Sequence, residues 1–131
     1  MGTSTSVSRA NTKRRVVLVV DDDDMIRRLV RTVLEADDLE VVEANSGARA
    51  LEMVDSAHPA VMVLDIMMPG INGVEVCRQV DHSTVKVVIL TARDDPALED
   101  ECREAGADAF LTKPFSSIEL LDLIDELVPA K

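Results

Sequence analysis

The stretch Val61–Gly73, V-M-V-L-D-I-M-M-P-G-I-N-G, decides the fold of this chain. Its first four residues are apolar and run directly into the carboxylate of Asp65, and a Pro-Gly pair follows a few positions later. A short apolar run bounded by turn residues indicates a buried strand that leads into a loop. We therefore expect Asp65 at the carboxyl end of a core strand, which is the edge where open parallel sheets bind ligands.

Similar apolar runs, each followed by an amphipathic stretch, lie on both sides of this strand. In the amphipathic stretches, Ser46 and either Ser116 or Ser117 are candidate N-caps, Pro96 suits a first helical turn, and Gly106 suits a helix end. The alternation predicts a single doubly wound α/β domain of flavodoxin-like type, with a five-stranded parallel sheet in the order 2-1-3-4-5 flanked by five helices. The strands are expected at Val16–Val20, Leu39–Ala44, Ala60–Asp65, Val85–Leu90 and Ala109–Thr112.

Length and composition argue against several classes of protein. The 131 residues suit one domain, and the Ser- and Thr-rich residues 1–14 predict a disordered tail ahead of a folded domain at 15–131. A net charge of −11 and only two aromatic residues argue against direct binding to nucleic acid. No apolar run approaches the roughly 20 residues of a membrane span, and no signal peptide is visible, so we expect a cytoplasmic protein. Cys77 and Cys102 lack metal-site spacing and are expected to be reduced thiols on helices.

Polar residues follow four of the five predicted strands. Taken singly, the Asp run could cap a helix, the threonine could cap a turn, and the lysine could be a solvated surface charge. A parallel sheet, however, gathers all of these strand ends at one edge. The residues are Asp21 and Asp22 after the first strand, Asp65 after the third, Thr91 after the fourth and Lys113 after the fifth.

Such an arrangement brings three carboxylates close together. Two like charges 4 Å apart repel by about 4 kcal/mol at an effective dielectric near 20. A divalent cation relieves this repulsion, and oxygen ligands from few side chains favour Mg²⁺, which often bridges carboxylate and phosphate. Lys113 adds a positive charge and Thr91 a hydroxyl donor. The set suits phosphoryl transfer to a carboxylate.

Four motifs, in this order and spacing, identify a resemblance to a known family. From Arg15 to about Val128 the chain resembles the receiver domains of two-component response regulators, and is chemotaxis-regulator-like. The motifs are V-V-D-D at Val19–Asp22, L-D-I-M-M-P-G-I-N-G at Leu64–Gly73, L-T-A at Leu90–Ala92 and G-A-D-A-F-L-T-K-P-F at Gly106–Phe115.

The resemblance implies a function for each residue of the cluster. It implies that a histidine kinase or phosphotransfer protein supplies the phosphoryl group, and that the domain catalyses its own phosphorylation and dephosphorylation rather than acting on an external substrate. The signal would then pass to a downstream protein effector or a fused output domain. The implied residues are Asp65 as phosphoacceptor, Asp21, Asp22, Asp65 and the Met67 carbonyl as Mg²⁺ ligands, Thr91 and Lys113 as phosphoryl contacts, and Thr91 and Phe110 as the conformational switch.

The chain departs from the usual family pattern in two places. Phe110 has no hydroxyl where the switch residue is often Tyr, so any switch works by packing alone. Ala109 replaces an acidic residue that is usual in regulators that dimerise through the fourth helix, fifth strand and fifth helix, which argues against that dimer. Met67 and Arg93 stand where the family borders the path of the attacking water. Neither supplies a carboxylate or amide to orient it, so we expect slow self-dephosphorylation.

The first helix is a candidate docking surface for the kinase. Ile26, Leu29 and Val30 cannot all be buried at one angle, so an apolar strip is expected to remain exposed near Arg27 and Arg28. An ordinary solvated helix flank is the alternative.

Two other functions share some of these features. Haloacid-dehalogenase-type phosphatases also place D-x-D after a first strand, but they need a further acidic pair and usually carry a cap domain, and they leave Asp65 unexplained. A receiver-like interaction module that no longer accepts phosphate would not require the complete set of residues found in this chain.

Overall fold

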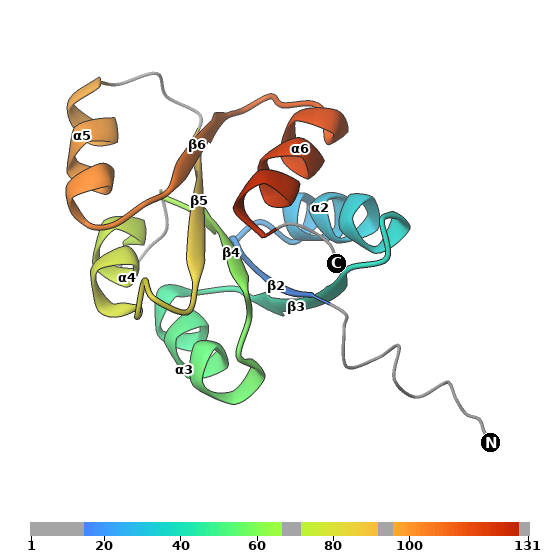
Figure 1. Ribbon diagram of the computed structural model, residues 1–131, viewed down its shortest axis with the longest axis horizontal. Helices are drawn as coiled ribbons and strands as arrows, with labels where there is room; N and C mark the ends of the chain where they lie inside the picture. Colours follow the sequence, from blue (N-terminus) through green and yellow to red (C-terminus); the bar gives the residue numbers. More distant parts are fainter. Residues whose placement is uncertain (1–14, 67–71, 92–95, 129–131) are drawn as a thin grey trace.

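The computed structural model describes residues 15–66, 72–91 and 96–128, and contains strands and helices in strict alternation (Figure 1). The helices are α2 (Asp24–Ala36), α3 (Gly47–Ala57), α4 (Gly73–Gln79), α5 (Pro96–Glu104) and α6 (Ser117–Leu127). The strands are β2 (Val16–Val20), β3 (Glu40–Ala44), β4 (Val61–Asp65), β5 (Lys86–Thr91) and β6 (Ala109–Thr112). The predicted strands agree with these to within one residue at each end.

All four strand pairings are parallel, and the strand order is β3-β2-β4-β5-β6. This confirms the predicted order 2-1-3-4-5 and the flavodoxin-like fold. The second strand begins at Glu40 rather than Leu39, because the Leu39 amide donates to the Leu34 carbonyl and so closes the end of α2. Thr91 belongs to β5, where it is in register with Thr112.

The sheet lies between two layers of helices, with α3, α4 and α5 on one face and α2 and α6 on the other (Figure 1). β2 and β4, the central strands, are apolar because both of their faces are covered. Each face has its own buried cluster, one packed on α3, α4 and α5 and the other on α2 and α6. Among the described residues, no helix is both long and apolar enough to cross a bilayer.

Local signals in the sequence account for where the helices begin and end. The side chain of Asp23 accepts from the first amides of α2, and Ser46 caps α3. Of the two serine candidates for α6, Ser116 is the cap, and it forms a capping box with Glu119. Gly106 ends α5 with a φ of 111°.

The turn after α5 is a Schellman motif. The Gly106 amide donates to Arg103 and the Ala107 amide to Cys102. A Cβ added at Gly106 would lie 2.4 Å from the His82 ring, so both the φ angle and the close approach require glycine here.

The two cysteines are free and buried, Cys77 in α4 and Cys102 in α5, as predicted. Burial raises the pKa of the Cys77 thiol to about 12 and that of the Cys102 thiol to about 11. Neither thiol is therefore reactive near neutral pH.

Candidate functional site

The buried polar side chains among the described residues are three, Asp21, Asp65 and Thr91. They are 1%, 6% and 7% exposed, and they stand at the carboxyl ends of the neighbouring strands β2, β4 and β5. Carboxylates are almost never this buried unless they are paired or bind a metal. The buried polar side chains of the described residues thus lie together at one edge of the sheet.

Asp21, Asp22 and Asp65 form an acidic cluster at this edge. Each offers a carboxylate oxygen, and these oxygens lie within 4.8 Å of one another. Asp22 is exposed, so the cluster opens toward solvent on one side. An all-oxygen donor set with a solvent-facing side fits Mg²⁺, which keeps several waters when it is bound by carboxylates.

Lys113 supplies the positive charge of the cluster. Its Nζ lies 3.4 Å from Oδ2 of Asp21 and 3.9 Å from Oδ1 of Asp65, and its side chain is only 22% exposed. The Lys113 amide donates to the Thr91 carbonyl at 2.7 Å, which ties the residue to the end of β5. Lys113 is therefore not a solvated surface charge. One ammonium against three carboxylates still leaves the site negative by about two charges, which favours a cation.

The position of Asp65 depends on a close approach between β4 and α4. The Gly73 amide donates to the Ile66 carbonyl at 3.2 Å, and Asn72 caps α4 by accepting from the Glu75 amide. A Cβ on Gly73 would lie 2.7 Å from the Ile66 Cα and 3.0 Å from the Asp65 carbonyl oxygen. Glycine lets the helix begin directly against the end of the strand that carries Asp65.

Phe110 on β6 lies beside the site, half-buried between β5 and α5. A cavity of about 10 Å³ separates the strands from the helix, and its lining includes Thr91, Cys102 and Phe110. This volume holds about one water molecule and no aromatic ring. The guanidinium of Arg103 covers the ring at 4.8 Å from its centroid, a cation–π contact. Nothing in the sequence distinguishes Arg103 from a solvated helix residue, so this contact was not predicted.

The outer surface of α2 carries exposed apolar side chains near the same edge. Met25 is 75% exposed and Leu29 is 57% exposed, while Val30 is buried. Of the three predicted residues, only Leu29 is exposed, whereas Ile26 is half-buried and Val30 is buried; the exposed side chain of Met25 was not predicted. Arg28 is exposed as a docking residue would be.

Arg27 does not fit the predicted docking surface. Its side chain is 14% exposed, and Nη1 donates at 2.7 Å to the backbone carbonyl of Asp21. The sequence alone offered no means of separating it from Arg28, because both basic residues follow the same Asp run. Two other predicted residues, Met67 and Arg93, lie outside the described residues.

Comparisons with known proteins identify the family to which this chain belongs. A family model described as "Response regulator receiver domain" matches residues 17–125. The chain is 42% identical to response regulator MprA of Mycobacterium leprae over 114 residues, which are 86% of this chain and 50% of that protein. It is 43% identical to the MprA of Mycobacterium ulcerans over 107 residues, 80% of this chain and 46% of that one. The chain thus spans about half the length of the curated relatives it matches.

Solved structures agree in fold as well. The chemotaxis protein CheY4 of Vibrio cholerae superposes with a TM-score of 0.82 at 30% identity, covering 88% of this chain and 99% of that one. The receiver domain of the Francisella response regulator 1452 gives a TM-score of 0.79 at 32% identity, covering 87% and 96% of the two chains.

Proposed function

Because the chain belongs to the response regulator receiver domain family, we propose that Asp65 accepts a phosphoryl group from a histidine kinase or phosphotransfer protein in a Mg²⁺-dependent reaction. The observation that carries the proposal is the burial of this carboxylate within 3.9 Å of Lys113 and beside Asp21 and Asp22. An Asp65 oxygen forms a bond to phosphorus while the bond from phosphorus to the donor breaks, and the leaving group keeps the electron pair. Attack by water on phosphorus later restores the carboxylate and releases phosphate.

We propose that Asp21, Asp22, Asp65 and the Met67 carbonyl hold the metal ion. When bound, Mg²⁺ would neutralise the charge on the transferred group and the donor.

Lys113 neutralises the phosphoryl oxygens from the β6 side, and the Thr91 hydroxyl donates to them from the end of β5. The site residues of this chain would thus catalyse both its phosphorylation and its dephosphorylation, with Met67 and Arg93 bordering the path of the hydrolytic water.

The phosphoacceptor assignment is tested by intact-mass measurement after incubation with acetyl phosphate and Mg²⁺. The wild type should gain one phosphoryl group and Asp65→Asn none. Asp55→Asn, an exposed aspartate on α3, is the matched control and should label as the wild type does. Equal labelling of Asp65→Asn would refute the assignment.

The switch proposal concerns Thr91 and Phe110. If the Thr91 hydroxyl turns toward the phosphoryl group, the Thr91 side chain leaves space in the small cavity that it lines together with Phe110. A cavity of about 10 Å³ is too small for the ring, so inward movement of Phe110 requires Thr91 and α5 to shift together. Breaking the Arg103 contact would cost about 0.5–1 kcal/mol at an exposed site. The surface formed by α5 and β6 is where an effector or output domain would sense the change.

We propose that the kinase docks on α2, in the cytoplasm. The exposed side chains of Met25 and Leu29 flank the edge that carries Asp65, and Ile118 on α6 is 70% exposed. α2 and α6 pack side by side on one face of the sheet (Figure 1). Arg28→Glu should slow transfer from a kinase and leave labelling by acetyl phosphate unchanged. Equal slowing with both donors would contradict docking at this surface.

A further inference from the structure

We propose that Arg27 is a positioning residue that anchors the Asp21–Asp24 turn to strand β3, and so sets the affinity of the acidic cluster for Mg²⁺. This inference rests on the proposed function. Arg27 touches neither the phosphoryl group nor the metal position. It acts through the backbone of Asp21.

The guanidinium of Arg27 makes three contacts at once. Nη1 donates to the Asp21 carbonyl at 2.7 Å, Nε donates to Oε1 of Glu43 at 2.9 Å, and Nη2 donates to the carboxylate of Asp24. The planar fork of arginine can reach three directions together, whereas a lysine ammonium is a single point charge. The Arg27 side chain is 14% exposed and that of Glu43 is 26% exposed, so the contacts to Asp21 and Glu43 are shielded from water more than an ordinary surface ion pair, whereas Asp24 is exposed.

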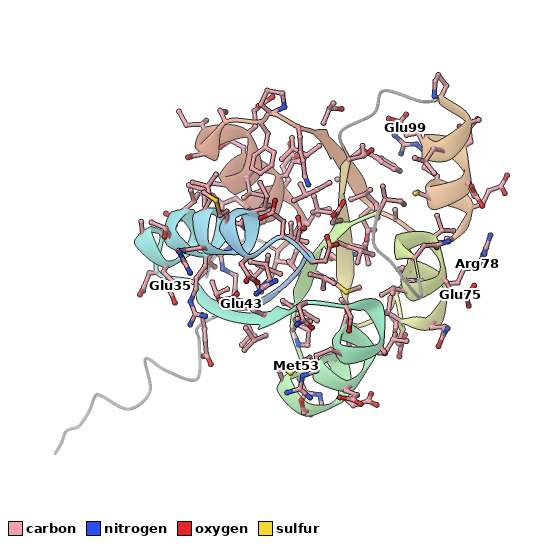
Figure 2. The ribbon with its side chains drawn as sticks, turned by 180° about the vertical axis from the view of Figure 1, so that it is seen from behind. Glu35, Glu43, Met53, Glu75, Arg78 and Glu99 are labelled. Atoms are coloured by element: carbon pink, nitrogen blue, oxygen red, sulfur yellow. The ribbon has the colours of Figure 1, made fainter. Side chains whose placement is uncertain are left out.

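Glu43 provides the fixed end of this anchor. It belongs to β3, whose backbone is hydrogen-bonded to β2 with Glu43 in register with Val19. Arg31 also donates to Glu43, at 2.5 Å, and hydrogen bonds from Arg31 and then Arg27 lower the pKa of the Glu43 carboxyl. Glu43 therefore remains ionised at neutral pH. Figure 2 shows Glu43 beside α2 at the β3 side of the sheet.

The backbone of Asp21 is thereby held at both of its polar groups. Its amide donates to the Ala44 carbonyl of β3 at 3.2 Å, and its carbonyl accepts from Arg27. The Asp21 side chain in turn accepts from the Asp23 amide at 2.9 Å. Both metal-ligand residues of this turn, Asp21 and Asp22, thus depend on a turn that is tied to the neighbouring strand.

Repulsion among the three carboxylates is the force that the Arg27 contacts oppose. Three carboxylates within 4.8 Å repel one another when no cation separates them, and two of the three belong to the turn that Arg27 contacts. Residues that hold metal ligands from outside typically change metal affinity by 10–100-fold when replaced. Loss of Arg27 should therefore weaken Mg²⁺ binding, while Lys113, Thr91 and Asp65 stay where they are.

The experiment compares Arg27→Gln with Arg31→Gln. Both variants lose one positive charge from α2 and one contact to Glu43, but Arg31 pairs otherwise with Glu35 and does not reach the turn. The half-saturating Mg²⁺ concentration is measured by titration calorimetry and by the rate of acetyl phosphate labelling as Mg²⁺ rises. Arg27→Gln should raise it about 10-fold or more, and Arg31→Gln less than 2-fold.

A purely structural role is separated from a positioning role by two further readouts. For Arg27→Gln, the labelling rate at saturating Mg²⁺ should recover most of the wild-type value, because the reacting groups are intact. Glu43→Gln retains Arg27 but removes the charge of its partner on β3. This variant should raise the half-saturating Mg²⁺ concentration by a smaller factor than Arg27→Gln. If Arg27→Gln fails to fold, Glu43→Gln against Arg31→Gln decides the question.

Equal shifts for the Arg27 and Arg31 variants, or no shift in either, would overturn the inference while leaving the proposed function in place. A wild-type protein that neither binds Mg²⁺ nor gains a phosphoryl group would overturn both.

Discussion

Replacement of Lys113 by methionine tests the electrostatic account of the site most directly. Methionine keeps much of the length of the side chain and removes its charge. At an effective dielectric near 20, the ammonium attracts the Asp21 carboxylate 3.4 Å away by about 5 kcal/mol and the Asp65 carboxylate 3.9 Å away by about 4 kcal/mol. The desolvation of Lys113 offsets part of this attraction.

We expect Lys113→Met to lower the free energy of unfolding by about 2–4 kcal/mol in the absence of metal, in the range found when one partner of a buried ion pair is removed and reduced for partial exposure. For a domain of this size, that corresponds to a fall in Tm on the order of 10 °C. Mg²⁺ should restore more stability to the variant than to the wild type, because a divalent cation relieves the repulsion that Lys113 no longer offsets.

Thermal unfolding followed by circular dichroism is the suitable assay, since the chain has no Trp or Tyr. Melts are recorded for wild type and variant in EDTA and in excess MgCl₂. Lys86→Met, an exposed lysine at the start of β5, is the matched control and should change stability by less than about 0.5 kcal/mol. If Lys113→Met melts like the Lys86 variant, or if Mg²⁺ stabilises Lys113→Met no more than the wild type, Lys113 does not balance the charge of the acidic cluster.

Three further predictions concern the core, one turn and the phosphoryl lifetime. Both thiols should resist iodoacetamide in the folded protein and react in urea. An unfolded thiol ionises near pH 8.5 and burial raises the pKa of Cys77 to about 12, so the free energy of unfolding should fall as pH rises through this interval. A free energy of unfolding that does not change with pH, or rapid labelling of the native protein, would contradict the burial of Cys77 and Cys102. Gly106→Ala should cost about 2–3 kcal/mol, part of which is recovered when His82 is also replaced by Ala, whereas equal losses in both backgrounds would remove the steric explanation. Met67→Asn should shorten the half-life of radiolabelled protein in Mg²⁺ buffer, and unchanged decay would show that this residue does not gate the attacking water.

The sequence alone determined the fold and the composition of the site. Apolar runs that stop at Asp21 and Asp65 predicted strands with acidic carboxyl ends, and their alternation with helices left one common strand order. Cap residues then placed several helix boundaries, because a cap is a local signal that needs only its own few neighbours. The gathering of the site at one edge also followed from topology, since parallel strands present all their carboxyl ends together.

The tertiary structure alone decided which side chains meet. Arg27 and Arg28 are equivalent in the sequence, yet one is 14% exposed and holds the Asp21 carbonyl while the other faces solvent. Successive helical residues differ by about 100° around the axis, so the rotation of α2 against β3 separates their roles. Lys113 meets Asp21 across 92 positions of sequence for the same kind of reason. Periodicity identifies elements and their ends, but the partner of a side chain depends on how neighbouring elements are packed together.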